Sequence, residues 1–208
     1  MSTYQLSPGS FRTCAKNIQA KPSCFVGLLI IAFLSLLNIV QAEDNLVKNP
    51  GFENITGHQP VDWRPSHSNE ELKEQGIEDA LDSQVFHSGD FSHNVSVPDS
   101  APADSYGYYQ DNIELKPSTN YRFSYWIKGK DVHDKIGASV ILHECDENGE
   151  VVNQVIASQK ARESFDWEKD EVAFRTAAST ARIRICNTTA SGTVWYDDFL
   201  LVEVLGTP

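Results

Sequence analysis

Apolar and polar residues alternate in short runs along most of the chain from Glu43 onward. In Tyr121–Lys128, aromatic and aliphatic residues occupy every second position, with mostly polar residues between them. Side chains on a strand point alternately to opposite faces, so this run predicts a strand with one buried and one solvent-facing side. Runs of this kind recur at about eight places: Ser92–Val97, Gly107–Leu115, Tyr121–Lys128, Ala138–Cys145, Val151–Ser158, Glu168–Thr176, Ala181–Asn187 and Val194–Val204.

Turn-forming residues separate these runs, as in Ser88-Gly89-Asp90 and Asp146-Glu147-Asn148-Gly149. Many short strands with frequent turns predict an all-β fold, an antiparallel sandwich of two sheets. The stretch Ser68–Ser83 differs, because Ser68 is suited to cap a helix that Gly76 would interrupt. We therefore expect one domain over residues 43–208, with a loop or short helix inserted at about 68–83.

A tryptophan, Trp126, falls in the polar row of Tyr121–Lys128. Leaving apolar area exposed forgoes about 25 cal/mol per Å², so the position requires an explanation. Either the indole contacts a ligand, or it lies beneath a loop or beneath the 68–83 insertion. The same alternation places further aromatic, amide and guanidinium side chains on solvent-facing rows: Tyr108, Gln110, Arg184 and Trp195.

This set of side chains suits a sugar ligand. The C–H face of a pyranose packs on an aromatic ring, while its hydroxyl groups need planar donors and acceptors to fix their orientation. The hypothesis requires Trp126, Tyr108 and Arg184 to converge on one concave surface.

The first 42 residues have the features of a secretory signal peptide. Residues 1–23 contain three basic residues and no acidic one, and Cys24–Val40 is apolar. Ala42 is a small residue immediately before the expected cleavage site. The alternative is an uncleaved membrane anchor, although the apolar run is at the lower limit for a span. We expect a secreted, periplasmic or extracellular protein.

The charge of the chain excludes two classes of partner. Without residues 1–42 the chain keeps 14 basic and 29 acidic residues, a net charge of −15. Such a surface repels nucleic acid and anionic membranes, so we expect neither as a partner.

Two of the four cysteines, Cys145 and Cys186, remain after signal cleavage. In an exported domain the simplest expectation is one disulfide, which would close a long loop and stabilise the fold by about 4 kcal/mol. Both residues fall on outward-facing rows if Val140 and Leu142 face the core. Two buried free thiols are the alternative.

Short motifs occur in a characteristic order along residues 45–204. They are Asn49-Pro50-Gly51-Phe52-Glu53, the central Tyr121–Gly129 run, and the closing Trp195-Tyr196-Asp197-Asp198. Together they resemble the cenC-type carbohydrate-binding module family, the galactose-binding-like modules often attached to bacterial xylanases and glucanases. The resemblance implies a β-jelly roll that binds a β-glycan in a groove on one sheet. No catalytic domain accompanies the module in this sequence, so a separate glycan-degrading enzyme or a cell-surface molecule is the additional partner we expect.

The resemblance also implies a structural calcium ion away from the groove. Glu53 matches the acidic residue of the opening motif, and Asp197 matches the first acidic residue of the closing pair. Calcium takes six to eight oxygen ligands, so carbonyls of the Ser88–Asp90 turn would complete the site. The alternative is that both carboxylates only cap turns.

Two other functions remain as alternatives to glycan binding. A protein or cell-surface interaction module could use the same aromatic residues, and a glycan-active hydrolase component would need paired carboxylates. Asp197 and Asp198 are poor candidates for such a pair, because neighbouring strand residues point to opposite faces. The sequence contains no recognisable catalytic motif, so we expect no enzyme activity.

Overall fold

The computed structural model of this chain describes residues 44–204, apart from 103, 105, 134–136 and 161–162. The predicted signal peptide, residues 1–42, lies outside the described residues. In the part that is described, no helix has both the length and the apolar character needed to cross a membrane.

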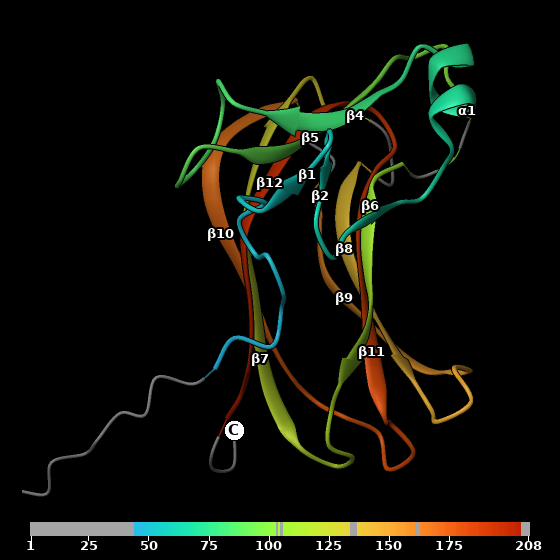
Figure 1. Cartoon of the computed structure of the whole chain (residues 1–208), viewed down its shortest axis with the longest axis vertical. Helices are drawn as coiled ribbons and strands as arrows, with labels where there is room; N and C mark the ends of the chain where they lie inside the picture. Colours follow the sequence, from blue (N-terminus) through green and yellow to red (C-terminus); the bar gives the residue numbers. More distant parts are fainter. Residues whose placement is uncertain (1–43, 103, 105, 134–136, 161–162, 205–208) are drawn as a thin grey trace, which may run out of the picture. The chain divides into compact units, whose positions relative to one another are not determined.

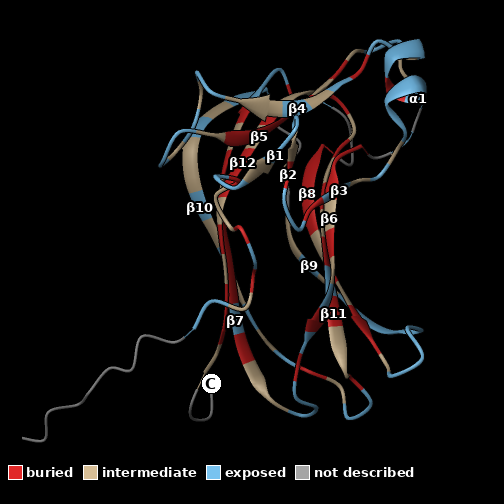
Figure 2. Ribbon diagram, in the orientation of Figure 1, coloured by how far each residue is buried: buried red, intermediate tan, exposed pale blue. Residues whose placement is uncertain are grey.

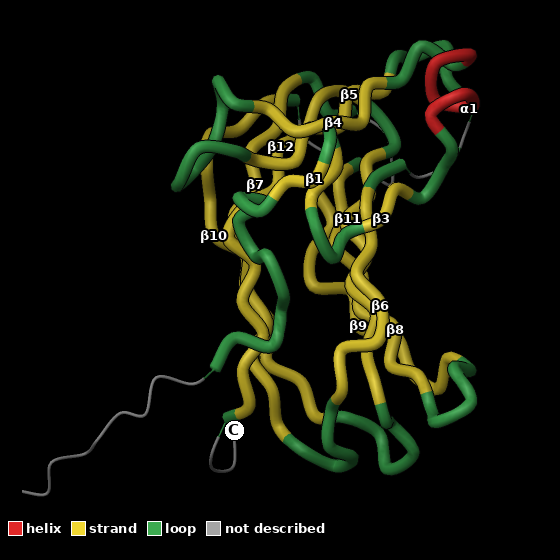
Figure 3. Tube along the Cα trace, viewed as in Figure 1, coloured by secondary structure: helices red, strands yellow, loops and turns green. Residues whose placement is uncertain are grey.

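Apart from one short helix, the described residues form strands and connecting loops (Figure 3). All eight predicted runs are strands, with ends that differ from the prediction by at most a few residues. The elements are β1 Ile55–Thr56, β2 Gln59–Pro60, β3 Arg64–Pro65, α1 Asn69–Glu74, β4 Glu78–Asp82, β5 Ser92–Val97, β6 Tyr108–Glu114, β7 Asn120–Lys130, β8 Ala138–Cys145, β9 Val151–Lys160, β10 Ser164–Arg175, β11 Arg182–Thr189 and β12 Gly192–Glu203.

Two five-stranded sheets pack face to face, as predicted for a sandwich (Figure 1). The first, in the order β10-β7-β12-β5-β4, is called the β7 sheet below, and the second, in the order β3-β6-β11-β8-β9, the β11 sheet. All pairings are antiparallel. Their outward surfaces are called the β7 face and the β11 face.

Aromatic and aliphatic side chains fill the space between the sheets, where Figure 2 shows the buried residues. The alternate residues of β7 that were predicted to be buried are each at most 2% exposed: Tyr121, Phe123, Tyr125 and Ile127. From the opposite layer, Ile183, Ile185 and Leu142 are fully buried. Burial of a large apolar side chain contributes roughly 1.5–3 kcal/mol, so this inner layer is the main source of stability.

The predicted insertion contains a helix of six residues followed by an edge strand. Ser68 caps α1, because its hydroxyl accepts the Glu71 amide while the Glu71 carboxylate accepts the Ser68 amide. This reciprocal arrangement is a capping box. The helix ends next to Gly76, which has φ of +71°, and the chain then enters β4.

The predicted disulfide between Cys145 and Cys186 is wrong, since both cysteines are free. They lie on the same face of adjacent strands, but Cys145 is opposite Arg182 and Cys186 is opposite Ile141. A four-residue offset corresponds to about 13 Å along the strand, whereas a disulfide requires Cα atoms less than about 7 Å apart. Strand register, which alternation does not reveal, separates the two thiols.

We predict that reductant will not change the unfolding temperature. Burial raises the pKa of the Cys186 thiol to about 11 and also raises the pKa of Cys145, so both thiols should react slowly until the domain unfolds. Thermal unfolding with and without dithiothreitol, combined with thiol titration before and after denaturation, checks this. A lower unfolding temperature in reductant would contradict the register described above.

Candidate functional site

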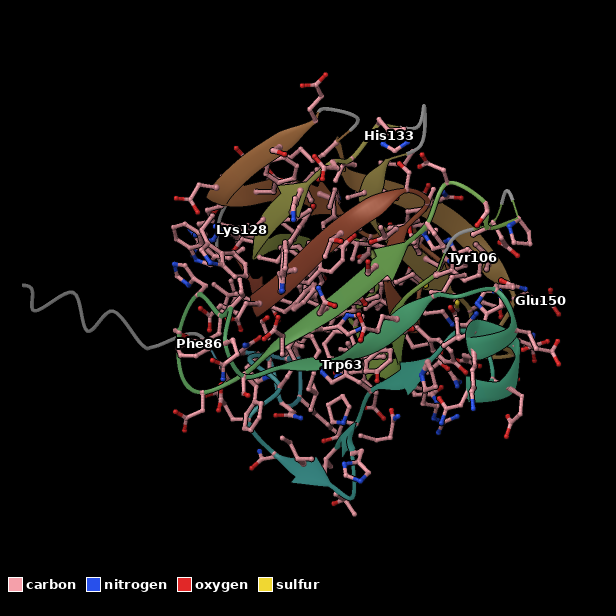
Figure 4. The ribbon with its side chains drawn as sticks, turned by 90° about the horizontal axis from the view of Figure 1, so that it is seen from above. Trp63, Phe86, Tyr106, Lys128, His133 and Glu150 are labelled. Atoms are coloured by element: carbon pink, nitrogen blue, oxygen red, sulfur yellow. The ribbon has the colours of Figure 1, made fainter. Side chains whose placement is uncertain are left out.

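The residues predicted to form one binding surface lie in three separate places. Trp126 and Trp195 are on the β7 face, Arg184 is on the β11 face, and Tyr108 and Gln110 are buried between the sheets. In Figure 4, Lys128 of β7 lies on the opposite side of the domain from Glu150, which precedes β9. The predicted convergence of Trp126, Tyr108 and Arg184 on one surface is therefore wrong.

A β-bulge explains the error for Tyr108 and Gln110. Opposite β11, the pairing changes from Ile183↔Ile113 to Ile185↔Gln110, so that two residues of β6 oppose Arg184 alone. Asn112, within this bulge, has φ of +58°. The extra residue reverses the alternation of side chains beyond the bulge, and Tyr108 and Gln110 turn inward instead of outward.

Both inward side chains have structural partners. The Tyr108 ring stacks on His93 with centroids 4.0 Å apart, and its hydroxyl donates to Gln59. The Gln110 amide accepts from the Lys48 backbone N–H at 2.9 Å and donates to the Lys48 carbonyl at 2.8 Å. Gln110 thus fixes the segment that leads into the domain.

Trp126 points outward, as predicted, and is covered by a loop. The imidazole of His87 lies parallel to the indole with centroids 3.8 Å apart, and the Trp167 ring meets His87 edge-on at 5.7 Å. His87 Nδ1 also lies 2.6 Å from a carboxylate oxygen of Asp198. The covering residue comes from the loop between β4 and β5, not from the 68–83 insertion.

Trp195 also faces outward on β12, opposite Lys128 of β7. Its indole N–H donates to Asp82 at 2.8 Å, and the ring is partly exposed. A shallow hollow of about 370 Å³ lies beside it, lined among others by Lys128, Lys130 and Asp166.

The β11 face carries a group of side chains that alternation alone did not identify. Arg184, 44% exposed, donates from Nε to Asp111 and lies over the Tyr109 ring at 5.5 Å. The bulge brings Tyr109 and Asp111 to this face beside Arg184. The Asp111-Asn112 pair within β6 was the available signal, because such residues favour positive φ and mark bulges or turns.

Further polar and apolar groups extend the β11 face on both sides. His143 of β8 pairs with Arg184, and partial burial together with the Arg184 charge lowers its pKa. On β9, Ile156 is 55% exposed. At the opposite edge of the sheet, beside β3 and β6, lies a hollow of about 420 Å³. It is lined by Lys48, Asp62, Trp63, Arg64, Gln110, Asp111 and Asn112.

Three carboxylates from the two ends of the domain hold the loop that covers Trp126. The Glu53 carboxylate accepts the backbone N–H groups of Asp90 and Phe91, and Asp197 accepts those of His87 and Ser88. We call Glu53, Asp197 and Asp198 the carboxylate clamp. A Cβ on Gly89 would lie 2.1 Å from Glu53 Oε1, so only glycine allows this approach.

A second bulge places Asp198 beside Asp197, contrary to the expectation that they point to opposite faces. The β12–β7 pairing shifts between Asp197 and Leu200, and Asp198 has φ of +48°. One oxygen of each aspartate lies within 3.5 Å of the position that a Cβ on Gly51 would occupy, and Glu53 Cγ lies 3.9 Å from it. Both carboxylates bind the covering loop: Asp197 accepts backbone N–H groups of His87 and Ser88, and Asp198 contacts the His87 imidazole and the Ser88 hydroxyl.

The clamp concentrates negative charge in a partly buried place. Burial and the neighbouring Asp198 charge raise the pKa of Asp197 from 3.8 to about 7, although three backbone N–H bonds oppose this shift. Glu53 and Asp197 are therefore brought to one region, as the calcium hypothesis requires. However, in the described ranges no three His, Cys, Asp or Glu side chains are grouped closely enough to hold a metal ion.

Comparisons with known proteins agree with this architecture. A family model described as a carbohydrate-binding domain, CBM_4_9, matches residues 44–192. A search of curated protein sequences finds no significant match.

Many solved structures are similar in fold, and three of them illustrate the range. The CBM22-1 xylan-binding domain of Paenibacillus barcinonensis Xyn10C has a TM-score of 0.55 at 13% identity, over 79% of this chain and 97% of that one. A family 16 carbohydrate-binding module has a TM-score of 0.53 at 21% identity, over 76% and 100%. A tailspike protein of bacteriophage CBA120 has a TM-score of 0.54 at 15% identity, over 77% of this chain and only 21% of the tailspike. At these identities the similarity is one of fold.

We predict that His87→Ala will expose Trp126. Removal of the stacked imidazole uncovers one face of the indole and releases one contact of the loop, so quenching of tryptophan fluorescence by acrylamide should increase. His58→Ala, a change at an exposed turn, is the control. The increase should vanish in a Trp126→Phe background; an equal increase there would show that another tryptophan is responsible.

Proposed function

Because the chain belongs to the CBM_4_9 family of carbohydrate-binding domains, we propose that it binds a polysaccharide or oligosaccharide on the β11 face, without catalysis. The observation that carries this assignment is the group of Tyr109, Asp111 and Arg184 on an exposed sheet surface. It combines an aromatic ring with charged donors and acceptors, the chemistry that sugar recognition requires.

Each residue of this group has a distinct part in binding. The Tyr109 ring offers a platform for the C–H face of a pyranose. The hydrogen bond to Asp111 raises the pKa of Arg184 and holds the guanidinium, which is charged in any case, in one orientation. Its remaining N–H groups then donate to sugar hydroxyls, and a side chain already held in place loses less entropy on binding.

We propose a β-linked glycan as the ligand, since an extended ribbon-like chain can follow an open sheet surface across several strands. His143 on β8, Ile156 on β9 and the hollow beside Arg64 would contact successive sugar units on either side of Arg184. Asp111 is engaged by Arg184, so its role in this proposal is to orient the guanidinium, not to transfer protons.

A protein-interaction module is the second candidate, and one observation favours it. Strand β9 is an edge of the β11 sheet, and Val151 and Val152 at its start are 54% and 39% exposed. Unpaired edge strands can add a strand from a partner chain. This function would use the sheet edge, whereas glycan binding uses the β11 face.

We predict that isothermal titration with soluble β-glucans, xylans and mannans will detect binding to at least one of them. Tyr109→Ala should weaken that binding about tenfold, equivalent to 1.4 kcal/mol. Phe86→Ala removes an exposed aromatic residue elsewhere and should leave the affinity unchanged. Prolonged incubation should release no reducing sugar. An absence of heat with every glycan would favour the interaction module instead.

We also propose that the carboxylate clamp holds a structural calcium ion. Glu53 and Asp197 would supply carboxylate oxygens, and backbone carbonyls of Ser88–Asp90 would be the further hard donors, because the carboxylates alone do not form a complete site. The geometry supports this proposal, because oxygens of Asp197 and Asp198 and the Glu53 side chain all lie near Gly51. The raised pKa of Asp197 reflects the cost of ionising it beside Asp198, and a cation would offset that cost. A bound ion would strengthen the connection between the two ends of the domain.

We predict that calcium will stabilise the domain most strongly above pH 7. The folded-state pKa of Asp197, about 7, lies above its usual value of 3.8, so folding favours the protonated carboxyl. Protonated Asp197 therefore stabilises the calcium-free fold at low pH, and this stabilisation is lost as pH rises through about 7. Calcium favours the ionised form and should offset the loss. Thermal unfolding at pH 5 and pH 8, with calcium or with chelator, measures both effects.

Asp197→Asn is the matched variant for this experiment. It keeps an oxygen acceptor but removes the charge, so the calcium response and the pH-dependent loss of stability should both shrink. If excess chelator does not change the unfolding temperature, the calcium proposal is wrong.

A further inference from the structure

Trp195 forms a rigid aromatic platform on the β7 face. Its indole N–H donates to Asp82 Oδ2, while Asp82 Oδ1 accepts the backbone N–H groups of Gln84 and Val85 at 2.7 and 3.1 Å. The carboxylate thus ties the tryptophan to the turn that follows β4. An indole fixed in this way can receive a ligand without further loss of side-chain entropy.

Two lysines lie beside this platform. Lys128 is directly opposite Trp195 in the β7–β12 pairing, and Lys130 is two residues further along β7 and therefore on the same face. Together with Asp166 they line the hollow of about 370 Å³ next to the indole. The hollow thus brings two ammonium groups together with the Asp166 carboxylate, in a chain whose net charge is −12.

The charge of these two lysines is accessible to a ligand. Lys128 Nζ lies 2.6 Å from Asp166 Oδ1, but the Asp166 side chain is 85% exposed. Ion pairs with so exposed a partner contribute little, usually 0–1 kcal/mol, so a ligand carboxylate can displace Asp166 at small cost. Lys130 is itself exposed.

We propose that this hollow binds a uronic acid residue of an acidic glycan. The C–H face of the pyranose packs on Trp195, and its carboxylate pairs with Lys128 and Lys130. This site is separate from the proposed glycan surface, because Trp195 and Arg184 lie on the outward faces of different sheets. The inference rests on the proposed glycan-binding function and adds a second contact with a stated sugar class.

The net charge of the protein limits the kind of acidic glycan that fits. Charges are screened beyond about 8–10 Å at moderate salt, so a single ligand carboxylate at the hollow interacts mainly with the two lysines and with Asp166, which it displaces from Lys128. A densely charged polyuronate would also meet the acidic remainder of the surface. The favoured ligand therefore carries isolated uronic acid groups on an otherwise neutral chain.

The test uses oligosaccharides of glucuronoxylan, galacturonan and alginate, each paired with its carboxyl-reduced counterpart. Isothermal titration with the full domain should show that at least one acidic ligand binds about five to ten times more tightly than its reduced form at low salt. The preference should be strongest for glucuronoxylan, in which the acidic groups are sparse, and should fall as salt increases.

Variants separate this site from the β11 face. Lys128→Gln combined with Lys130→Gln should abolish the preference for the acidic form and leave binding of the reduced form intact. Trp195→Phe should lower the affinity for the acidic ligand, while Lys73→Gln on α1 should leave the affinity for both forms unchanged. Circular dichroism and unfolding temperatures verify that each variant is folded.

The outcomes distinguish the two proposals. If reduced and acidic forms bind equally and the lysine variant has no effect, the uronic acid site is overturned while glycan binding stands. If no ligand in this set or in the neutral panel binds, the proposed function itself fails. If Tyr109→Ala removes the acidic preference as completely as the lysine variant does, acidic sugars bind on the β11 face and the second site is overturned.

Discussion

Burial of the inner faces of the two sheets against each other determines where every other group in this domain can lie. Phe123, Tyr125 and Tyr196 from one layer and Ile183 and Ile185 from the other are fully buried. Two packed sheets lie about 10 Å apart, so their outward faces are separated by the whole thickness of the core. Side chains on the β7 face and on the β11 face cannot contact the same sugar unit.

Two bulges modify this arrangement at functionally important positions. At Asn112 the bulge brings Tyr109 and Asp111 to the β11 face beside Arg184, and at Asp198 it brings the third carboxylate to the clamp. Both positions have positive φ, which is energetically unfavourable for most residues but tolerated by asparagine and aspartate. In each case a local departure from regular strand geometry produces a concentration of charge that a regular strand would have divided between two faces.

The carboxylate clamp connects the ends of the domain with the β7 face. Glu53 from the opening motif and Asp197 from the last strand hold the same loop through backbone N–H groups, and that loop places His87 on Trp126. Asp198 binds the imidazole directly. The position of the Trp126 cover therefore depends on residues that are far apart in the chain, and Asp197 carries a raised pKa because it is buried beside a like charge.

The sandwich could be predicted from the amino-acid sequence, because alternation with period two and frequent turn residues depend only on local geometry. The sequence also identified the outward direction of Trp126, Arg184 and Trp195 and the acidic motifs at both ends. Which outward residues lie next to one another depends on how the strands pair. Register separates Cys145 from Cys186 by four residues, and a bulge buries Tyr108. Register, bulges and the assignment of strands to sheets arise from pairing between distant segments, so no pattern within one strand can reveal them.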